Sequence, residues 1–451
     1  MPSARPSPPS PFARLCTFVA SDVDIASLAA FRVSFGVAMM VLVARFFAHG
    51  WIREYYLTPR ILFPHATWIR PWPGLGMYVH YGAMGVLALL VALGLFARPA
   101  VLLFGALFTY AHFLDRTNWL NHYWLVSLLT VVLASVPCDR ALSVRVLRDR
   151  DAARATIPGW CLALVRFQIG IVYVFGGIAK LKGDWLLHAE PLRIWLGANT
   201  DFPILGRAFG YREAAYAMSW GGAAFDLFVV PCLLVRRTRV PAYLALLAFH
   251  GITARLFQLG MFPWIMASAA LVFFEPSWPR AFLPPRAFGP VVARRTHPTR
   301  AFVPGLAAFV LFQILFPFRH LLYPGNVLWT EQGFRFSWNV MLMEKNGAIE
   351  FTVVTPDGRR SVVDLSEWLT RYQIKMMATQ PDMIVDFAHV VAEDARARGK
   401  GTVRVFVDAR VALNGRAPTP LVDPHVDLAR ENDTFAPKTW VTPAPTAPPQ
   451  L

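Results

Sequence analysis

The sequence predicts a polytopic α-helical membrane protein with eight or nine transmembrane helices, followed by a small soluble α+β domain rich in β-structure. The first observation is composition: of the 451 residues, 55% are hydrophobic and only 16% are charged, with a mean hydropathy of +0.42. This is too apolar for a soluble globular chain. The second is a change after Phe316, where long apolar runs give way to alternating β-branched and polar residues.

Apolar windows give the expected membrane helices. They fall at about Ile25–Phe47, Met77–Phe96, Ala100–Phe113, His122–Val136, Leu162–Ile178, Trp220–Val235, Tyr243–Phe257, Phe262–Phe274 and Phe302–Phe316. Several are shorter than the roughly 20 residues that a perpendicular membrane helix needs, so these are extended by their flanks, tilted, or only partly embedded. We expect the transmembrane domain to occupy residues 21–320.

The soluble domain is expected at residues 325–435. Two segments, AIEFTVVTPDGRRSVVDL and TVRVFVDARVALNGRAPTPLV, alternate around Asp357-Gly358 and Asn414-Gly415, a pattern typical of two strands joined by a turn. Between them DMIVDFAHVVAEDARARGK has helical spacing, and Gly399 is placed to end that helix. The proline-rich ends of the chain, residues 1–20 and 436–451, are predicted to be disordered tails.

The distribution of arginine predicts the topology. Arginines concentrate in the short loops after the second, fourth, sixth and eighth windows, although the first loop also carries three. The positive-inside rule places those even-numbered loops in the cytoplasm. His122, Lys180 and everything after the ninth window then lie outside the cytoplasm, and the short arginine-rich loops fit a bacterial inner membrane.

Charge and cysteine usage argue against two classes of site. The formal net charge is +16 and the isoelectric point is near 10.2, but a nucleic-acid interface needs a solvated basic face, so we expect no nucleic-acid binding. The four cysteines have no C-x-x-C pair and no zinc or disulfide spacing. A metal site would need ligands from several spans, so we expect none.

Ionisable residues within or beside the apolar windows are the first candidates for function, because they are costly there and usually face the bundle interior. They are Asp115, Arg116, His122, Arg166, Lys180, Asp226, His250 and Arg255. Lys180 and Arg116 could instead snorkel to the lipid headgroups, and His122 with Trp119 could be an interfacial anchor. For Arg166 and Asp226 the alternative is a buried structural pair between the two.

Lys180 lies in YVFGGIAKLKGDW, at the edge of the fifth window. Desolvation disfavours a charged ammonium group, so a lysine in a partly dehydrated site can present a free amine that takes a proton near neutral pH. The pattern allows Lys180 to be such a base but does not establish it.

This segment resembles vitamin K-dependent γ-glutamyl carboxylases, in which an apolar helix ends in glycine, lysine, leucine and then Asp-Trp. Five more segments agree in the same order: FLDRTNWLNHYWL, FHGITARLFQLGMFPWIM, FEPSWPR, FRFSWNVML and LVDPHVDLARENDTFAPKTWVTP. The resemblance covers about residues 25 to 443 and implies an HTTM-type membrane domain. The short soluble part and the lack of a suitable cysteine pair depart from the vertebrate enzymes and resemble a bacterial-type homologue.

The resemblance implies a peptidyl-glutamate 4-carboxylase with vitamin K epoxidase activity. A base deprotonates vitamin K hydroquinone, the anion reacts with O₂, and a strongly basic oxygenated intermediate removes a γ-proton from glutamate. The carbanion captures CO₂, which gives γ-carboxyglutamate and vitamin K epoxide. The implied partners are a glutamate-containing peptide or protein and the membrane lipid; the oligomeric state is not implied.

The resemblance also assigns residues. Lys180 matches the catalytic lysine, and His122 matches a histidine that orients the quinone anion or its oxygenated product by hydrogen bonding. The supporting positions matched are Asp115, Trp119, Asn121, Arg166, Asp226 and His250. Leu120 stands where the family has asparagine. Arg166 and Asp226 are expected to form a pair near the base, and the role of His250 stays open.

Two other functions remain open. The protein could be a quinol epoxidase or oxygenase that acts on another acceptor without glutamate carboxylation. It could also be a non-enzymatic membrane transport or scaffold protein, for which replacing Lys180 would leave function intact. CO₂ fixation that depends on a glutamate peptide separates the first of these from the carboxylase.

Overall fold

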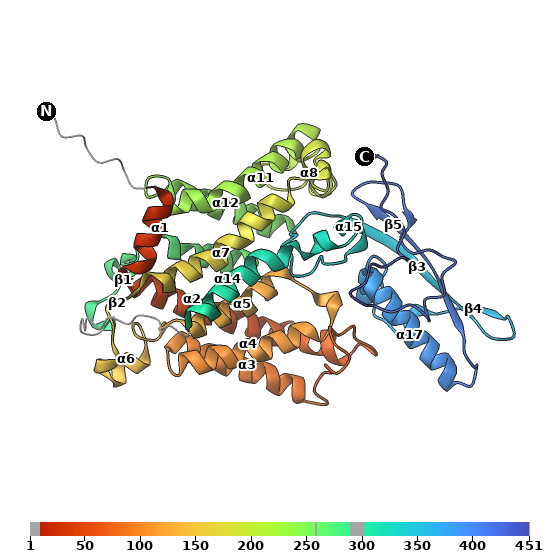
Figure 1. Ribbon diagram of the computed structural model, residues 1–451, viewed down its shortest axis with the longest axis horizontal. Helices are drawn as coiled ribbons and strands as arrows, with labels where there is room; N and C mark the ends of the chain where they lie inside the picture. Colours follow the sequence, from red (N-terminus) through yellow and green to blue (C-terminus); the bar gives the residue numbers. More distant parts are fainter. Residues whose placement is uncertain (1–9, 258, 289–301, 451) are drawn as a thin grey trace.

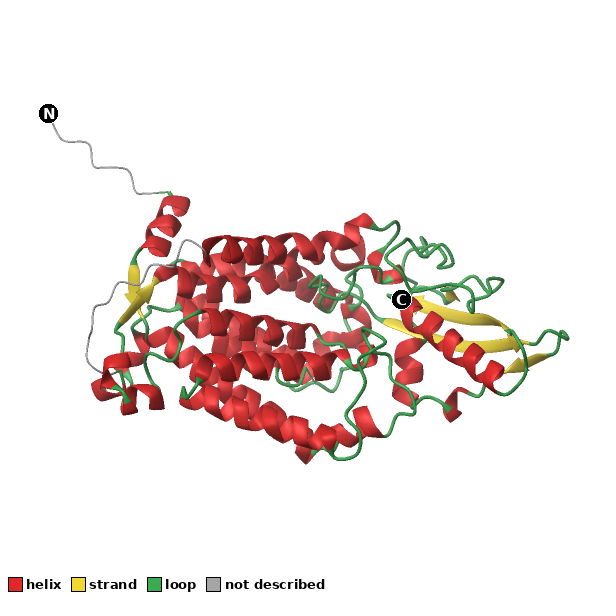
Figure 2. Ribbon diagram, turned by 60° about the horizontal axis from the view of Figure 1, so that its bottom comes forward, coloured by secondary structure: helices red, strands yellow, loops and turns green. Residues whose placement is uncertain are grey.

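The structure is a computed structural model that describes residues 10–257, 259–288 and 302–450. A bundle of long helices forms one part, and a domain with an antiparallel sheet lies at one end of it (Figures 1 and 2). The opposite end carries a two-stranded antiparallel sheet of β1 (Asp22–Asp24) and β2 (Thr156–Pro158), which Figure 2 shows in yellow. Two short segments separated by more than 130 residues in the chain thus close that end of the bundle.

Helices long and apolar enough to cross a membrane number six among the described residues. They are α2 (Ala26–Ala48), α3 (Gly76–Leu93), α7 (Gly159–Ala179), α11 (Arg212–Leu234), α12 (Arg239–Phe257) and the segment Val303–Leu322, which combines α14 (Phe302–Leu315) with the 3-10 helix η7 (Phe316–Leu322). The structure therefore has the expected class, but it does not confirm a count of eight or nine spans.

Shorter helices account for the difference in the number of spans. They are α4 (Ala97–Phe113), α5 (Asn121–Ser135) and α13 (Phe262–Ala269), which continues into the 3-10 helix η4 (Ala270–Phe273). α5 has 15 residues and α4 has 17. At 1.5 Å per residue such helices reach about 22 to 26 Å, less than the roughly 30 Å hydrocarbon core.

A glycine in α7 allows this helix to pack very close to α11. A Cβ atom on Gly177 of α7 would lie 2.7 Å from Cγ of Leu227 and 2.9 Å from its backbone nitrogen on α11. Only a residue without a side chain permits this approach, as is common between membrane helices. α7 and α11 are therefore packed backbone against backbone.

Short helices connect the long ones at the two ends of the bundle. They are α1 (Pro11–Ala20), α6 (Val144–Arg148), α8 (Gly183–His188), α9 (Leu192–Gly197) and α10 (Gly206–Phe209). The N-terminal tail was expected to be disordered; residues 1–9 lie outside the described residues, but α1 is helical. Its N-cap Ser10 accepts a hydrogen bond from the backbone N–H of Ala13 at 3.2 Å, which satisfies one of the free donors of the first turn.

The C-terminal domain is built on a four-stranded antiparallel sheet in the order β4-β3-β5-β6. Its elements are α15 (Val327–Thr330), β3 (Lys345–Val354), β4 (Arg360–Val362), α16 (Arg371–Met377), α17 (Pro381–Ala397), β5 (Arg404–Leu413) and β6 (Thr419–Pro420). β3 and β5 pair along their whole length, from Lys345 opposite Leu413 to Val354 opposite Arg404. α17 packs on the sheet through Phe387, whose ring lies 4.9 Å from that of Phe351.

The turns of this domain lie where the sequence predicts them. Gly358 joins β3 to β4, Gly415 follows β5, and Gly399 follows α17, with φ angles of 84°, 75° and 74°. These left-handed conformations favour glycine, which has no Cβ to clash with the backbone.

The last residues of the chain are ordered, which differs from the predicted tail at 436–451. Trp440 is buried, Val441 forms a β-bridge with Val422, and the backbone N–H of Gln450 donates to the carbonyl of Gly415 at 3.0 Å. Proline-rich composition predicted disorder here, but one buried tryptophan and backbone hydrogen bonds attach the segment to the sheet. Leu451 lies outside the described residues.

Candidate active site

Lys180 and Asp226 form a buried ion pair. Lys180 is the C-cap residue of α7, and its Nζ lies 2.7 Å from Oδ2 of Asp226 in the middle of α11. The exposed fractions of the two side chains are 6% and 9%. Nζ also donates to the carbonyl oxygen of Gly176 at 3.3 Å. The ammonium group therefore does not snorkel to the headgroups but points into the protein.

An aromatic side chain supports the lysine from the segment that follows it. The indole ring of Trp185 in α8 lies 5.2 Å from Nζ of Lys180, within the range of a cation–π contact. Its Nε1 donates to the carbonyl of Ser219 on α11 at 2.7 Å, and the hydroxyl of Ser219 donates back to the carbonyl of Trp185. The turn after α7 is thus fixed on the same helix that supplies Asp226.

The expected pair between Arg166 and Asp226 is wrong. Nε and Nη2 of Arg166 donate to the carbonyls of Val272 and Phe274 at 2.7 and 3.0 Å. These carbonyls end the 3-10 helix η4, where a cation is favoured because the last carbonyls have no partner within the helix. Arg166 therefore bonds to the end of η4, about four helical turns away from Lys180 along α7.

Two histidines from the sequence prediction lie on either side of one aromatic residue. The rings of His122 at the start of α5 and His250 in α12 are each 5.5 Å from that of Phe262. Nε2 of His250 is 2.8 Å from the hydroxyl of Tyr173 on α7. Tyr173 precedes Lys180 by about two helical turns, so the two lie on the same face of α7. Sequence reasoning missed Tyr173.

The loop before α5 carries the other predicted residues. Asp115 does not contact the lysine. Its Oδ1 accepts from the backbone N–H of Thr117 at 2.9 Å and thereby caps the 3-10 helix η2 (Arg116–Asn118). Trp119 follows this helix, with the ring of His112 stacked on it at 4.5 Å and the ring of Phe336 at 4.4 Å.

Unpartnered buried polar atoms gather around this loop. Among the described residues, buried side-chain atoms without a hydrogen bond include Nε1 of Trp119, Oδ1 of Asn121, Nδ1 of His112 and both ring nitrogens of His65. Buried polar groups in folded proteins are nearly always hydrogen-bonded. These atoms are therefore available to a ligand. His65 and His112 were not predicted, since neither lies in a pattern that distinguishes it from a packed core histidine.

His65 is held in its neutral form. Burial and the positive charges of Arg335 and Arg116 lower its pKa to about 3. Its ring lies 5.4 Å from that of Trp119. An uncharged imidazole can donate one hydrogen bond and accept another.

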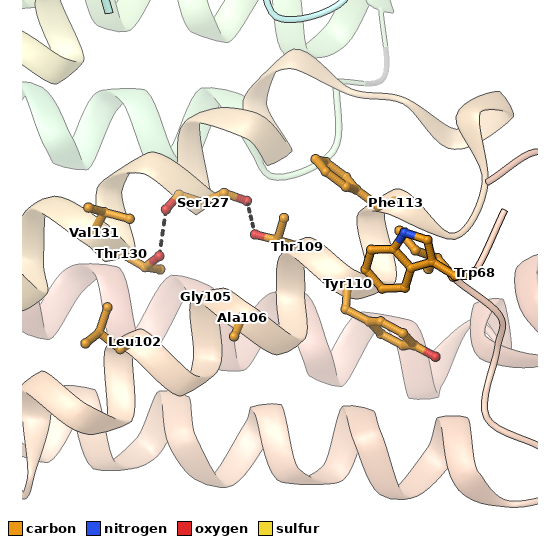
Figure 3. A pocket seen from close by; sticks show the side chains of 11 residues that line it. Trp68, Leu102, Gly105, Ala106, Thr109, Tyr110, Phe113, Ser127, Thr130 and Val131 are labelled. Atoms are coloured by element: carbon orange, nitrogen blue, oxygen red, sulfur yellow. Dashed lines mark hydrogen bonds between the residues drawn. The ribbon is translucent and has the colours of Figure 1, made fainter. Parts of the chain in front are cut away.

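An apolar groove leads away from this region between α4 and α5 (Figure 3). Its volume is about 450 Å³. Phe113 lines one end, and its ring stacks on His65 at 4.5 Å. Leu102 and Val131 line the other end and are 52% and 47% exposed on the outside of the helices. The hydroxyl groups in the groove are hydrogen-bonded to one another or to the backbone, so its wall is effectively apolar.

The site segments share one end of the bundle. Arg116, beside the start of α5, contacts Asp382 of the C-terminal domain at 2.8 Å, and Asp184, just after Lys180, contacts Arg416 of that domain at 2.6 Å. The start of α5, the end of α7 and the C-terminal domain therefore lie together. Arg116 does not snorkel. In the described part of the chain, no three His, Cys, Asp or Glu side chains are placed to hold a metal ion.

Both parts of this architecture match models of known protein families. Residues 21–278, more than half of the chain, match the family model described as HTTM domain, so the helical bundle defines an integral membrane protein of the HTTM class. Residues 298–447 match the model described as vitamin K-dependent gamma-carboxylase, lumenal domain. With both parts matched in order, the chain belongs to the vitamin K-dependent gamma-carboxylase family. No solved structure matches it significantly.

Proposed function

We propose that this protein is a vitamin K hydroquinone-dependent γ-glutamyl carboxylase in which Lys180 is the base that takes a proton from the quinol. Family membership supports a vitamin K-dependent carboxylase-like function in general. The observation that supports the role of Lys180 is its buried contact with Asp226 at the end of the bundle where the C-terminal domain lies.

Asp226 makes proton uptake by Lys180 favourable. When the neutral amine takes a proton it becomes an ammonium group, which costs several kcal/mol in a poorly solvated site without a counter-charge. Oδ2 of Asp226, 2.7 Å from Nζ, supplies that counter-charge. In the proposed reaction the ion pair is the form of the site after proton uptake, and the lysine must pass its proton on before the next cycle.

The residues around Trp119 fit a flat aromatic head group. The unpartnered nitrogens of Trp119, His112 and His65 and the amide oxygen of Asn121 offer donors and acceptors for ring oxygens. When bound, reduced vitamin K reacts with O₂ and supplies the strong base that removes the glutamate γ-proton before CO₂ adds. We assign to His122, beside Phe262, the role of a hydrogen-bond donor or acceptor to this group.

The apolar groove between α4 and α5 fits the lipid-soluble tail of the quinol. Its exposed end faces outward between the apolar helices α4 and α5, so the tail would enter sideways from the bilayer. The glutamyl peptide and CO₂ then arrive from the aqueous side at the C-terminal domain, which we place outside the cytoplasm of a bacterial inner membrane. An interfacial, water-poor site protects a strong base from quenching by solvent.

Two products measured together test this proposal. Purified protein in detergent receives vitamin K hydroquinone, O₂, labelled bicarbonate and a glutamate-rich peptide, and quinone epoxide and fixed label are quantified. Wild type should form both products, and Lys180→Ala should form neither. Lys182→Ala is the matched control, because this second lysine lies outside the pair with Asp226, and it should retain both activities.

The other outcomes separate the competing functions. Epoxide without fixed label would assign the protein to a quinol oxygenase with a different acceptor. Neither product from folded wild-type protein would reject the enzymatic assignment in favour of a membrane transport or scaffold protein. Equal loss in the Lys180 and Lys182 variants would reject a specific role for Lys180.

A further inference from the structure

The loop that leads to His122 is attached to the C-terminal domain by a partly buried cluster of charges. Nη1 of Arg116 contacts Oδ2 of Asp382 at 2.8 Å and Oδ2 of Asp433 at 3.3 Å, and Nη2 contacts Asp386. The side chains of Arg116 and Asp382 are 7% and 12% exposed, so this contact is largely removed from water, whereas Asp386 and Asp433 are 36% and 31% exposed. We call these four residues the Arg116 cluster.

Neighbouring residues of the same loop are attached as well. Nε2 of Gln373 donates to Oδ2 of Asp115 at 3.2 Å, and the hydroxyl of Tyr372 donates to the backbone carbonyl of Thr117 at 3.1 Å. Three consecutive positions of the membrane part are thus bonded to the C-terminal domain, and His122 follows five residues later.

A second cluster attaches the segment after Lys180. Oδ1 of Asp184 contacts Nη2 of Arg416 at 2.6 Å, and its Oδ2 accepts from Nη1 of Arg416 at 2.8 Å and from Nδ2 of Asn414 at 2.9 Å. Burial alone would raise the pKa of Asp184, but the bonds from Arg416 and Asn414 outweigh it and hold the pKa below its usual value. These three residues are the Asp184 cluster.

Both clusters act on the geometry of the site. Asp184 is adjacent to Trp185, whose ring lies 5.2 Å from Nζ of Lys180, and Arg116 is in the 3-10 helix that leads to Trp119 and His122. The base and the histidine come from different helices, α7 and α5, and the C-terminal domain is bonded to the segment beside each. The contact of Arg416 with Asp184 is bidentate, and Arg116 divides its donors among three carboxylates, so each arginine is held in direction as well as distance.

We propose that the C-terminal domain sets the position of His122 relative to Lys180 by holding both segments at once, with Arg116 and Arg416 as positioning residues. The inference rests on the proposed roles of Lys180 and His122. Small errors in the placement of reacting groups cost about 10²-fold in rate, so loosening either cluster should slow the chemical step.

The test uses the full-length protein with Arg116→Gln and Arg416→Gln, and with Arg116→Lys and Arg416→Lys as conservative variants. Arg410→Gln is the control, since Arg410 pairs with Asp408 on an exposed face of the same domain with side chains 60% and 50% exposed. Two readouts are collected: kcat and KM for quinol epoxidation per folded enzyme, and hydrogen exchange at residues 115–122 and 181–185.

Each glutamine variant should raise exchange in its own segment and lower kcat by about 10- to 100-fold. Lysine keeps the charge but lacks the planar set of donors with which each arginine contacts its carboxylates, so the lysine variants should fall between wild type and glutamine. If a glutamine variant does not fold, the lysine variant at the same position is compared with wild type instead. Arg410→Gln should match wild type in both readouts.

Two results would overturn the inference: unchanged exchange in both segments, or faster exchange with an unchanged kcat. If wild-type protein forms no epoxide, the proposed function fails and the catalytic part of this inference fails with it. Hydrogen exchange then still decides whether the two clusters hold the segments.

Discussion

Replacing Asp226 with asparagine should destabilise the protein strongly, because it leaves the ammonium group of Lys180 buried without a counter-charge. The two groups are 2.7 Å apart, and their side chains are 6% and 9% exposed. Removing one partner of a buried ion pair costs about 3–5 kcal/mol, whereas the loss of an ordinary hydrogen bond costs about 0.5–1.5 kcal/mol. The expected loss of folding free energy in Asp226→Asn is therefore well above the loss caused by removing a neutral hydrogen bond.

Removing both charges separates stability from activity. The double variant Lys180→Met with Asp226→Leu replaces the pair with apolar side chains of similar size, which is often neutral or stabilising. It should unfold near the wild-type temperature and form no epoxide. Thermal unfolding in detergent, measured alongside epoxidation for wild type, Asp226→Asn, Lys180→Met and the double variant, provides the comparison.

The reasoning would be refuted by either of two results. One is an Asp226→Asn protein that unfolds at the wild-type temperature, which would mean that the charges are already well solvated. The other is a double variant less stable than both single variants, which would mean that the two side chains are not energetically coupled.

Three further perturbations test other parts of the structure. Gly177→Ala should force α7 and α11 apart, lowering stability by about 1–3 kcal/mol and epoxidation per folded enzyme; a wild-type unfolding temperature would contradict the close packing. Arg166→Gln should lower the unfolding temperature but not kcat, because the bonds of Arg166 to η4 lie away from the site. A reduced kcat would show that Arg166 contributes to the site. Burial alone would raise the pKa of Asp382, but Arg335 and Arg116 hold it well below 3.8; its stabilisation is thus present above about pH 3.8 and lost as the pH falls through the folded value. Limited proteolysis should therefore release the C-terminal domain increasingly as the pH falls from 4 towards 2, and not at pH 6, and Asp382→Asn should reduce this difference.

Local features of the fold could be predicted from the sequence. Turn glycines, the alternation of β3 and β5 and the spacing of α17 depend on neighbouring residues, so Gly358, Gly399 and Gly415 lie where expected. The number of spans was not confirmed, because a hydropathy window cannot distinguish a short helix packed within the bundle from one that crosses the membrane. The order of the C-terminal tail depends on Trp440 meeting a core formed elsewhere.

The candidate site was only partly predictable for a similar reason. Arg166 and Lys180 are 14 residues apart, about 3.9 helical turns, so they lie on nearly the same face of α7 and either could meet Asp226. The relative shift of α7 and α11 decides between them, and no periodicity within one helix encodes that shift. The contact of Arg116 with Asp382 joins residues 266 positions apart and has no local signal.

The opposite signs of the two clusters have a consequence for assembly. The membrane part presents a cation in Arg116 and an anion in Asp184, and the C-terminal domain presents carboxylates to the first and Arg416 to the second. A domain turned by half a revolution would bring Arg416 against Arg116 and the carboxylates against Asp184, with like charges facing each other out of water. Such an arrangement is strongly disfavoured. The charge pattern thus favours the observed docking orientation over the reversed one.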